Sequence, residues 1–593
     1  MNNLYKLFFP FRAKFGVRFF VFSLSFFLIF STFSFAGDIP QNINYTKIYD
    51  FLDELAIDGI IEINSVIKPY SREFIAQKLL EAKEKEELLN SRQNKDVDFY
   101  LNDYALELNQ LPDTKVNFAR TDNLTFALIQ PAFHYHDELF RLRITPIVGA
   151  EFYVNKNDFV ANRRIGAELQ ATVGKYFTVF GSLRDIAFQG ERLARPSFLN
   201  QFPGAEYKET MRDSDGADYS DSRGGIKFSN NWMSVGLVKD QIMWGDNYHG
   251  SNIISGRAPS FPMITLQVKP VRWFQLDYFH GFLVSNVLDS TSYYLEETQG
   301  GKMEKRFRPA NKFIAANMLT FTPIRNLNIS IGNATIYSEP NVQPAYFIPI
   351  AFYKSIAHTQ TKGTVAQNGN SAIFFNVSSR NIKHLHLYTS LFIDEIKFAR
   401  FRSSHPENNP ISFKIGGRLS NFPLQNVSLT GEYTRTNIIP FKHSIPVTTW
   451  ESNSFNMGHY LVDNAQEIYV ELGYKPIRGL DLSFSYMNAK KGNEYNYIRG
   501  DHREGIRRAI AQEVMKDIIW TNQTYSFKAL YEVFNNCYAG INVIYSDIQG
   551  HDAKSEPIPS EVRLDAQGYL DRFTPNFFQG KNLTLNMMLT IGF

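Results

Sequence analysis

One run of the chain, residues 244–262, gathers the side chains best suited to chemistry. Flat aromatic faces bind the C–H surfaces of a ligand, and planar polar groups bind its hydroxyls. The run supplies both kinds of group, and its candidate contact residues are Trp244, Asp246, Asn247, Tyr248, His249 and Arg257. The alternative is that Trp244 belongs to an aromatic girdle at a membrane interface, while the Gly, Asn and Pro residues only shape a loop. Both interpretations stay open at the sequence level.

Sets of residues for catalysis or metal binding are weak elsewhere in the chain. His384-x-His386 would place two imidazoles on one strand face, but no Cys, Asp or Glu lies at a recognised ligand spacing from them. Histidines that are hydrogen-bonded inside the protein are the simpler interpretation. The chain contains neither Gly-x-Ser-x-Gly nor His-Glu-x-x-His, and Cys537 has no recognisable motif around it. We therefore expect no catalytic residues, no metal and no cofactor, and a protein that is not an enzyme.

The run at 244–262 lies between two segments that alternate strictly. Apolar residues occupy every second position on both sides: Met233, Val235 and Leu237 before it, and Ile264, Leu266 and Val268 after it. A period of two predicts strands, so the run is a loop carried on a sheet. Similar segments continue from about Lys115 almost to the last residue. We count roughly 18 to 20 of them, each about 9 to 12 residues long, which is the length that a tilted strand needs to cross a bilayer.

The connections between these segments alternate in length. Tight turns share a Pro, a polar pair and an apolar restart; they begin at Pro270, Pro323, Pro423 and Pro476. Long polar loops occupy the other set of connections, at residues 185–223, 241–261, 285–311, 437–465 and 489–520. This asymmetry is typical of an outer-membrane barrel. The run at 244–262 belongs to the long-loop end, which predicts an extracellular or lumen-entering loop.

The last strand favours a closed barrel over an open sheet. Apolar residues alternate from Leu583 to Phe593, and the chain ends on an aromatic residue. A soluble edge strand this long and apolar would invite aggregation, whereas a closed barrel leaves no edge. The sequence therefore predicts an all-β transmembrane barrel of antiparallel strands.

The start of the chain reads as an export signal followed by helices. Four basic residues, an apolar stretch and the small-x-small sequence Ser34-Phe35-Ala36 predict a signal peptide over residues 1–36, cleaved near Ala36. From Thr46 to about Leu108 the apolar period is helical, with Gly59 placed to stop one helix and Ser71 placed to cap the next. A unit of this size is expected to pack against something larger. We divide the chain into a signal peptide (1–36), a helical periplasmic region (37–113) and an outer-membrane barrel (114–593).

Charge argues against a nucleic-acid partner, because the net charge is only +3 over 593 residues. If the richer apolar face of each strand meets lipid, the lumen receives charges of both signs. Its predicted polar residues are Arg143, Glu151, Glu168, Gln170, Lys414, Arg418, Glu432, Glu467, Glu471 and Asp481. This mixture fits a salt-bridged, plugged or narrow interior at least as well as an ion-selective pore.

The run at 244–262 resembles the Wzi capsule-assembly family, whose members carry a Trp-Gly, Gly-Ser and apolar-Ser pattern between strands. The opening of the chain, from residues 55–61 through 69–76, is similar to the helix-loop-helix start of that family. The resemblance covers nearly all of the mature chain. It implies a barrel of about 18 strands with a periplasmic helical bundle. It also implies a lectin-like role in surface retention or assembly of capsular polysaccharide, in which the six candidate contact residues of the run would meet the sugar.

Two classes of function follow. The leading one is a non-enzymatic protein in the outer membrane of a Gram-negative-type bacterium that binds, or helps to assemble and retain, capsular or exopolysaccharide. Its expected partners are that polysaccharide, outer-membrane lipid and lipopolysaccharide, and the barrel-assembly machinery. The rival is a porin or transport channel for small solutes. Residues 339–370 stay open: they could form an inward-folded plug, or another strand with a long loop.

Overall fold

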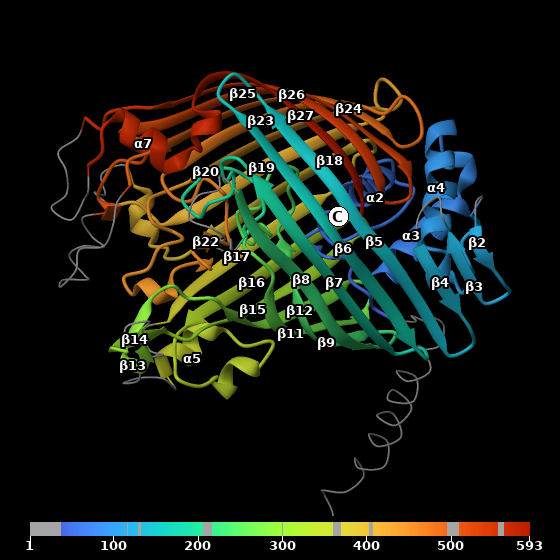
Figure 1. Cartoon of the computed structure of the whole chain (residues 1–593), viewed down its shortest axis with the longest axis horizontal. Helices are drawn as coiled ribbons and strands as arrows, with labels where there is room; N and C mark the ends of the chain where they lie inside the picture. The colour runs from blue at the N-terminus through green and yellow to red at the C-terminus, as the bar shows by residue number, and fades with distance from the viewer. Residues whose placement is uncertain are drawn as a thin grey trace, which may run out of the picture.

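In the computed structural model the chain forms a closed β-barrel with a small helical unit at one end (Figure 1). The structure describes residues 37–114, 117–127, 132–205, 216–298, 301–359, 369–402, 407–494, 509–554 and 563–592. The predicted signal peptide, residues 1–36, and the terminal Phe593 lie outside these ranges.

The barrel wall contains, within the described ranges, 18 antiparallel strands that close where β27 pairs with β5. In order around the wall they are β5 (Phe140–Val154), β6 (Phe159–Val173), β7 (Phe177–Gln189), β8 (Gly216–Ser229), β9 (Met233–Asp240), β11 (Phe261–Val271), β12 (Phe274–Leu283), β15 (Lys312–Ile324), β16 (Leu327–Tyr337), β17 (Asn370–Ser379), β18 (Leu385–Ile393), β19 (Ile411–Ser420), β20 (Val427–Thr436), β23 (Ala465–Tyr474), β24 (Leu480–Gly492), β25 (Ile518–Phe534), β26 (Cys537–Gly550) and β27 (Gly580–Ile591). Short strands β2 (Asn117–Arg120), β3 (Leu124–Ala127) and β4 (Ala132–His136) extend the sheet beside β5. The predicted barrel and its strand number are confirmed.

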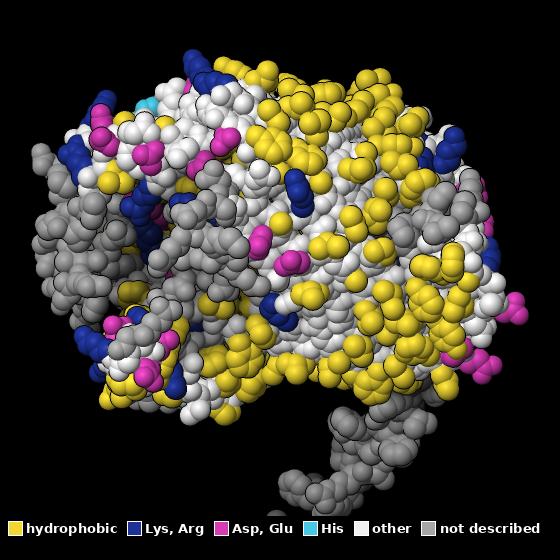
Figure 2. All heavy atoms as spheres, viewed as in Figure 1, with side chains coloured by type: hydrophobic (Ala, Val, Ile, Leu, Met, Phe, Trp, Pro, Cys, Tyr) yellow, Lys and Arg dark blue, Asp and Glu magenta, His cyan; other side chains and the backbone are white. Residues whose placement is uncertain are grey.

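Alternation along each strand sorts the side chains into two faces. Ile165, Leu237 and Leu583 point outward and are 65%, 57% and 63% exposed, as lipid-facing residues are. Hydrophobic side chains spread over the strands on the face in Figure 2, and charged side chains are concentrated towards the two ends. Among the described residues no helix is long and apolar enough to span a membrane.

The connections differ at the two ends of the barrel. Tight turns join the strands at one end; the pairing of β11 with β12, for example, continues to Val271 and Phe274. The other end carries long loops with elements of their own: β13 (Leu288–Glu297), β14 (Met303–Pro309), α5 (Tyr353–Thr359) and α7 (Ala566–Phe573). We call these the tight-turn end and the long-loop end. Figure 1 shows the helical unit at the former and α7 at the latter.

The helical unit consists of α2 (Thr46–Ile57), α3 (Arg72–Lys83) and α4 (Ser91–Asp103), which share an apolar core. Ser71 caps α3 as predicted, since its side chain accepts a hydrogen bond from the Phe74 N–H at 3.1 Å. Gly59 follows α2 with φ +77°. The unit also packs against the barrel, because α2 contacts β19.

The described part of the segment after β16 forms neither the inward-folded plug nor the strand that the sequence left open. Its described part runs through a short 3-10 helix (Pro344–Phe347) to α5. It lies against the outer face of the wall, where the Asn317 and Asn333 side chains bond to the Ala351 carbonyl. Alternation ends at Tyr337, and sequence periodicity alone does not indicate that a loop folds back over the outside.

Candidate functional site

The run at 244–262 folds into the lumen instead of standing above the barrel. There β10 (Met243–Trp244) pairs with β1 (Ile67–Lys68) of the N-terminal region. Gly245, with φ +99°, permits the turn that follows, and its N–H donates to the Val66 carbonyl at 2.8 Å. Of the two predicted positions, the lumen-entering one is observed. We call residues 241–260 the inward loop.

Three of the six predicted contact residues are buried within the protein, Trp244 and Arg257 among them. Trp244 is 3% exposed and packs edge-on against Phe279, with ring centroids 5.1 Å apart. Arg257 is 4% exposed, and its Nη2 donates to the Phe198 carbonyl at 2.6 Å. These positions fit neither an interfacial girdle for Trp244 nor an exposed sugar contact for Arg257.

Asp246 is also buried, at 2% exposed, and its carboxylate is occupied by protein partners. It accepts hydrogen bonds from the Ser65 hydroxyl and from Asn376 Nδ2, the latter at 2.6 Å. The Asp246 N–H donates to Asn376 Oδ1 at 3.1 Å. The residue therefore ties the inward loop to both the N-terminal segment and β17.

The other three candidates keep exposed surface. The Tyr248 hydroxyl donates to Asp53 of α2 and lies 2.8 Å from His386 Nδ1. The His249 ring stacks on Tyr469 of β23, with centroids 3.8 Å apart and planes at 9°. Asn247 makes a local bond, its Nδ2 donating to the Gly245 carbonyl at 2.8 Å. All three are half-buried.

Glu432 of β20 fixes the backbone of this half-buried turn. Its two oxygens accept from the N–H groups of Tyr248 and His249 at 2.6 and 3.0 Å. Lys414 of β19, which lies 2.7 Å from Glu432, balances the carboxylate charge. A buried ion pair that also receives two backbone bonds is well satisfied, so it holds the loop in one position.

The sequence predicts only some of the residues that surround the inward loop. Glu432 and Lys414 were predicted to face the lumen, and they do so as a pair. His386 is the hydrogen-bonded interior histidine that was predicted, since its Nε2 lies 2.9 Å from the Ser378 hydroxyl. His384 instead contacts Asp58 at the tight-turn end, at 2.9 Å. Asn376 was missed, because an amide on an alternating strand gives no signal of its partner.

Ion pairs join α2 to the tight-turn end of the barrel. Asp50 pairs with Arg418 and with Lys475, the latter at 2.5 Å, and Glu54 lies 2.8 Å from Lys475. Burial alone would raise the pKa of Asp50, but these two cations outweigh it and hold the pKa well below its usual range. These ion pairs hold α2 against the barrel, where Asp53 of α2 contacts Tyr248 of the inward loop.

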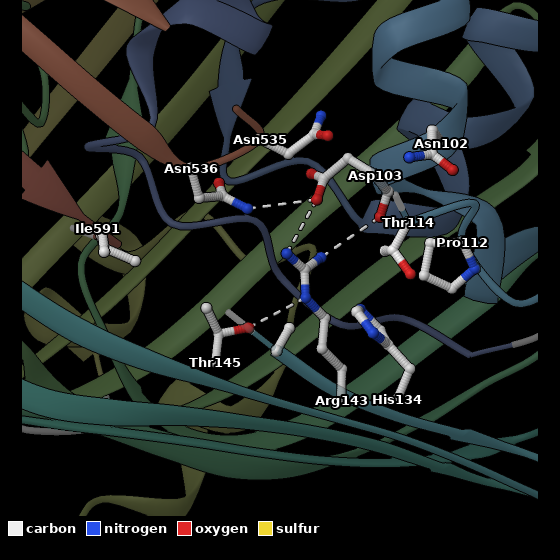
Figure 3. A pocket seen from close by; sticks show the side chains of 11 residues that line it. Asn102, Asp103, Pro112, Thr114, His134, Arg143, Thr145, Asn535, Asn536 and Ile591 are labelled. Atoms are coloured by element: carbon white, nitrogen blue, oxygen red, sulfur yellow. Dashed lines mark hydrogen bonds and ion pairs between the residues drawn. The ribbon is translucent and has the colours of Figure 1, made fainter. Parts of the chain in front are cut away.

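A small cavity of about 20 Å³ lies between α4, β5 and the β25–β26 turn (Figure 3). Arg143 reaches across it to Asp103, with Nη2 2.9 Å from Oδ1, and Asn536 Nδ2 donates to the same oxygen at 3.2 Å. This volume holds about one water molecule, so the cavity is too small for a sugar. Within the described ranges no three His, Cys, Asp or Glu side chains form a group able to hold a metal ion.

Comparison with models of known protein families identifies the family of this chain. A family model described as Capsule assembly protein Wzi matches residues 153–528, which is more than half of the sequence. The chain belongs to the Wzi capsule-assembly family. The matched region begins in β5 and ends in β25, so it includes the whole inward loop. The protein is therefore an outer-membrane β-barrel with a capsule-related function.

The solved structure of a Wzi protein supports the fold. The chain is similar to Wzi of Escherichia coli, described as an outer membrane protein involved in group 1 capsule assembly and a carbohydrate-binding β-barrel. The TM-score is 0.54 at 11% identity, covering 94% of this chain and 100% of that one. OprD and OccK8 of Pseudomonas aeruginosa have TM-scores of 0.37 and 0.39 at 9% identity, covering 76% of this chain and 94% and 97% of theirs. Comparison with curated proteins found no match.

Proposed function

We propose that this Wzi-family barrel binds capsular or exopolysaccharide at the cell surface and helps to assemble and retain it, without catalysing a reaction. The main support for this proposal is that protein fills the lumen beside the inward loop. Asn376, Ser390 and Lys414 point into the barrel, yet they are 0%, 1% and 0% exposed. A porin keeps such side chains hydrated, because solutes pass along them. A blocked interior therefore favours a protein that binds polymer over one that conducts solutes.

Within the inward loop we keep Asn247, Tyr248 and His249 as proposed sugar contacts. Their half-exposed side chains offer an amide, a phenol ring and an imidazole, which suit hydroxyls and the apolar face of a sugar. Trp244, Asp246 and Arg257 are buried, and we assign them the positioning of the loop. Substituting any of these three residues would weaken binding indirectly, by disturbing the structure of the loop.

The wider cellular setting is part of the same proposal. Signal-peptide cleavage near Ala36 would release the mature chain for export, and the barrel-assembly machinery would insert it. Outer-membrane lipid and lipopolysaccharide would then surround the apolar outer face. The tight-turn end with the helical unit would face the periplasm, because barrel chains enter from that side.

Deleting the protein tests the function directly. Cell-bound polysaccharide is expected to fall and released polysaccharide to rise, while total synthesis stays constant. A strain in which cell-bound capsule is unchanged would contradict the proposal. Complementation with His249→Ala should restore the barrel to the membrane but retain less polymer than the wild type. Lys383→Ala, which changes an exposed side chain at a tight turn, is the control and should retain it fully.

A porin remains the second candidate, because part of the inner face is not covered. Lys528 of β25 points inward and is exposed, and Asn542 opposite it on β26 is half-buried. Single-channel recording in planar bilayers separates the two functions. The binding protein predicts little or no steady conductance, whereas a large steady open level would favour the porin.

A further inference from the structure

A polar and aromatic patch lies on the outer face of the wall, where lipid-facing residues are expected. Asn317 of β15 has the same strand parity as Phe321, and Asn333 of β16 has that of Ile331. Phe321 and Ile331 are 38% and 42% exposed and belong to the apolar belt. Asn317, in contrast, is fully buried at 0%. Uncovered amides beside hydrocarbon would be costly, so something must replace lipid here.

Residues 344–357 provide this cover, and we call them the strap. The Ala351 carbonyl accepts from Asn317 Nδ2 at 2.9 Å and from Asn333 Nδ2 at 3.2 Å. The Tyr353 N–H donates back to Asn333 Oδ1 at 2.9 Å. Both amides are thereby satisfied by strap backbone, which fixes the strap against the wall.

Aromatic side chains make further contacts between the strap and the wall, towards the long-loop end. The Tyr278 hydroxyl of β12 donates to the Tyr346 carbonyl at 3.0 Å. Tyr337 and Tyr346 have ring centroids 4.6 Å apart, and Tyr346 is 0% exposed. Buried aromatic side chains therefore hold the strap on the wall, in addition to the hydrogen bonds.

The opposite side of the strap is apolar and uncovered. Its exposed side chains are Ile348 at 50%, Ile350 at 67% and Phe352 at 49%. Phe347 is 39% exposed but also contacts His280 of the wall, with ring centroids 4.9 Å apart. A soluble surface seldom groups three large, exposed apolar residues within five positions. Their position beside the apolar belt makes them a continuation of that belt.

We propose that the strap is a lipid-binding element, with Ile348, Ile350 and Phe352 among the acyl chains of the outer leaflet. The polar wall beneath it is hidden from those chains. Irregular backbone is not tolerated deep in hydrocarbon, so the strap lies at the boundary between headgroups and acyl chains. This contact with lipid is independent of any binding of polysaccharide.

Site-directed spin labelling tests the strap in the full-length protein, reconstituted in phospholipid vesicles. Cys537 is the sole cysteine, so a Cys537→Ser background allows one label at a time. Labels go on Ile350→Cys and Ile348→Cys of the strap, with two references. Ile331→Cys is the reference for the apolar belt, and the exposed Asn341→Cys is the reference for water. Collision rates with oxygen and with a water-soluble nickel complex give the depth of each label.

The strap labels are expected to collide with oxygen and to be shielded from nickel, as at position 331, at a depth of about 5–10 Å within the boundary region. Nickel access equal to that at position 341 would overturn the proposal, since the strap would then face water. Shielding from both probes would also overturn it, because another protein surface would be covering the strap. Circular dichroism of each labelled variant confirms that the barrel has folded.

Discussion

Asp246 joins three parts of the chain that are far apart in sequence. It bonds to Ser65 near the N-terminus and to Asn376 of β17, 130 residues further on. The residue type and its place in a loop were visible in the sequence. Its partners were not, because alternation reports which face a residue takes and not what crosses the lumen to meet it.

Replacing Asp246 should therefore destabilise the protein. In Asp246→Ala the buried Asn376 amide and Ser65 hydroxyl lose their acceptor, which costs about 1–3 kcal/mol. The measurement is the free energy of unfolding in urea. Asn247→Ala is the matched control, because that side chain bonds only within the loop, to Gly245 and Met243. Equal effects of the two substitutions would contradict the assigned role of Asp246.

At the scale of the element, α2 shows how much a helical period can reveal. Apolar residues at helical spacing predicted both the helix and its buried face, and Leu52 and Leu55 are 0% exposed. The acidic face gave no comparable signal. Asp50, Asp53 and Glu54 look like a solvated face in the sequence, yet they pair with barrel cations. Those cations lie more than 300 residues away.

Glu54 provides the sharpest test of these contacts. Its side chain is 3% exposed and lies against Arg92 and Lys475. Glu54→Gln leaves both cations short of a partner, and we expect a loss of about 3 kcal/mol. This is at the lower end for a buried pair, because Arg92 keeps Asp96 and Lys475 keeps Asp50.

The helical circular-dichroism signal, followed through urea unfolding, measures this loss. Glu62→Gln is the control, because Glu62 and Arg325 form an exposed pair, 48% and 63% accessible, at the same end of the barrel. Such pairs contribute less than about 1 kcal/mol. A loss as small for Glu54→Gln as for Glu62→Gln would show that the α2 pairs do not seat the helix.

Acid should release the same element. Burial would raise the pKa of Glu54, but Lys475 and Arg92 outweigh it and lower the value from 4.5 to about 2. A lowered folded-state pKa contributes stability above the unfolded value, and that stability is lost as pH falls towards the folded one. The difference in stability between wild type and Glu54→Gln should thus be full near neutral pH and shrink between about pH 4.5 and 2. A difference that stays constant over this range would exclude Glu54 ionisation as its source.

At the scale of the whole molecule, the barrel could be predicted because lipid imposes a simple rule. Each strand must show an apolar face outward, and each tight turn must restart that pattern, so both are written locally in the chain. The filled lumen and the strap depend on contacts between distant segments. The sequence accordingly left the inward loop with two positions and residues 339–370 with two arrangements, neither of which was the observed strap.

The inward loop should act as a plug for one side of the lumen. Ser390 of β18 is 1% exposed, and its hydroxyl donates to Asn252 of the loop at 2.6 Å. Ser526 of β25 also points inward but is only half-buried.

In a Cys537→Ser background, Ser390→Cys should react slowly with a water-soluble thiol reagent and Ser526→Cys quickly. Replacing residues 246–256 by a short Gly-Ser link should speed the reaction at position 390 by at least about tenfold, since access no longer requires local opening. The rate at position 526 should not change. If Ser390→Cys already reacts as fast as Ser526→Cys with the loop intact, water reaches the whole lumen, and the case for a binding protein over a porin loses its main support.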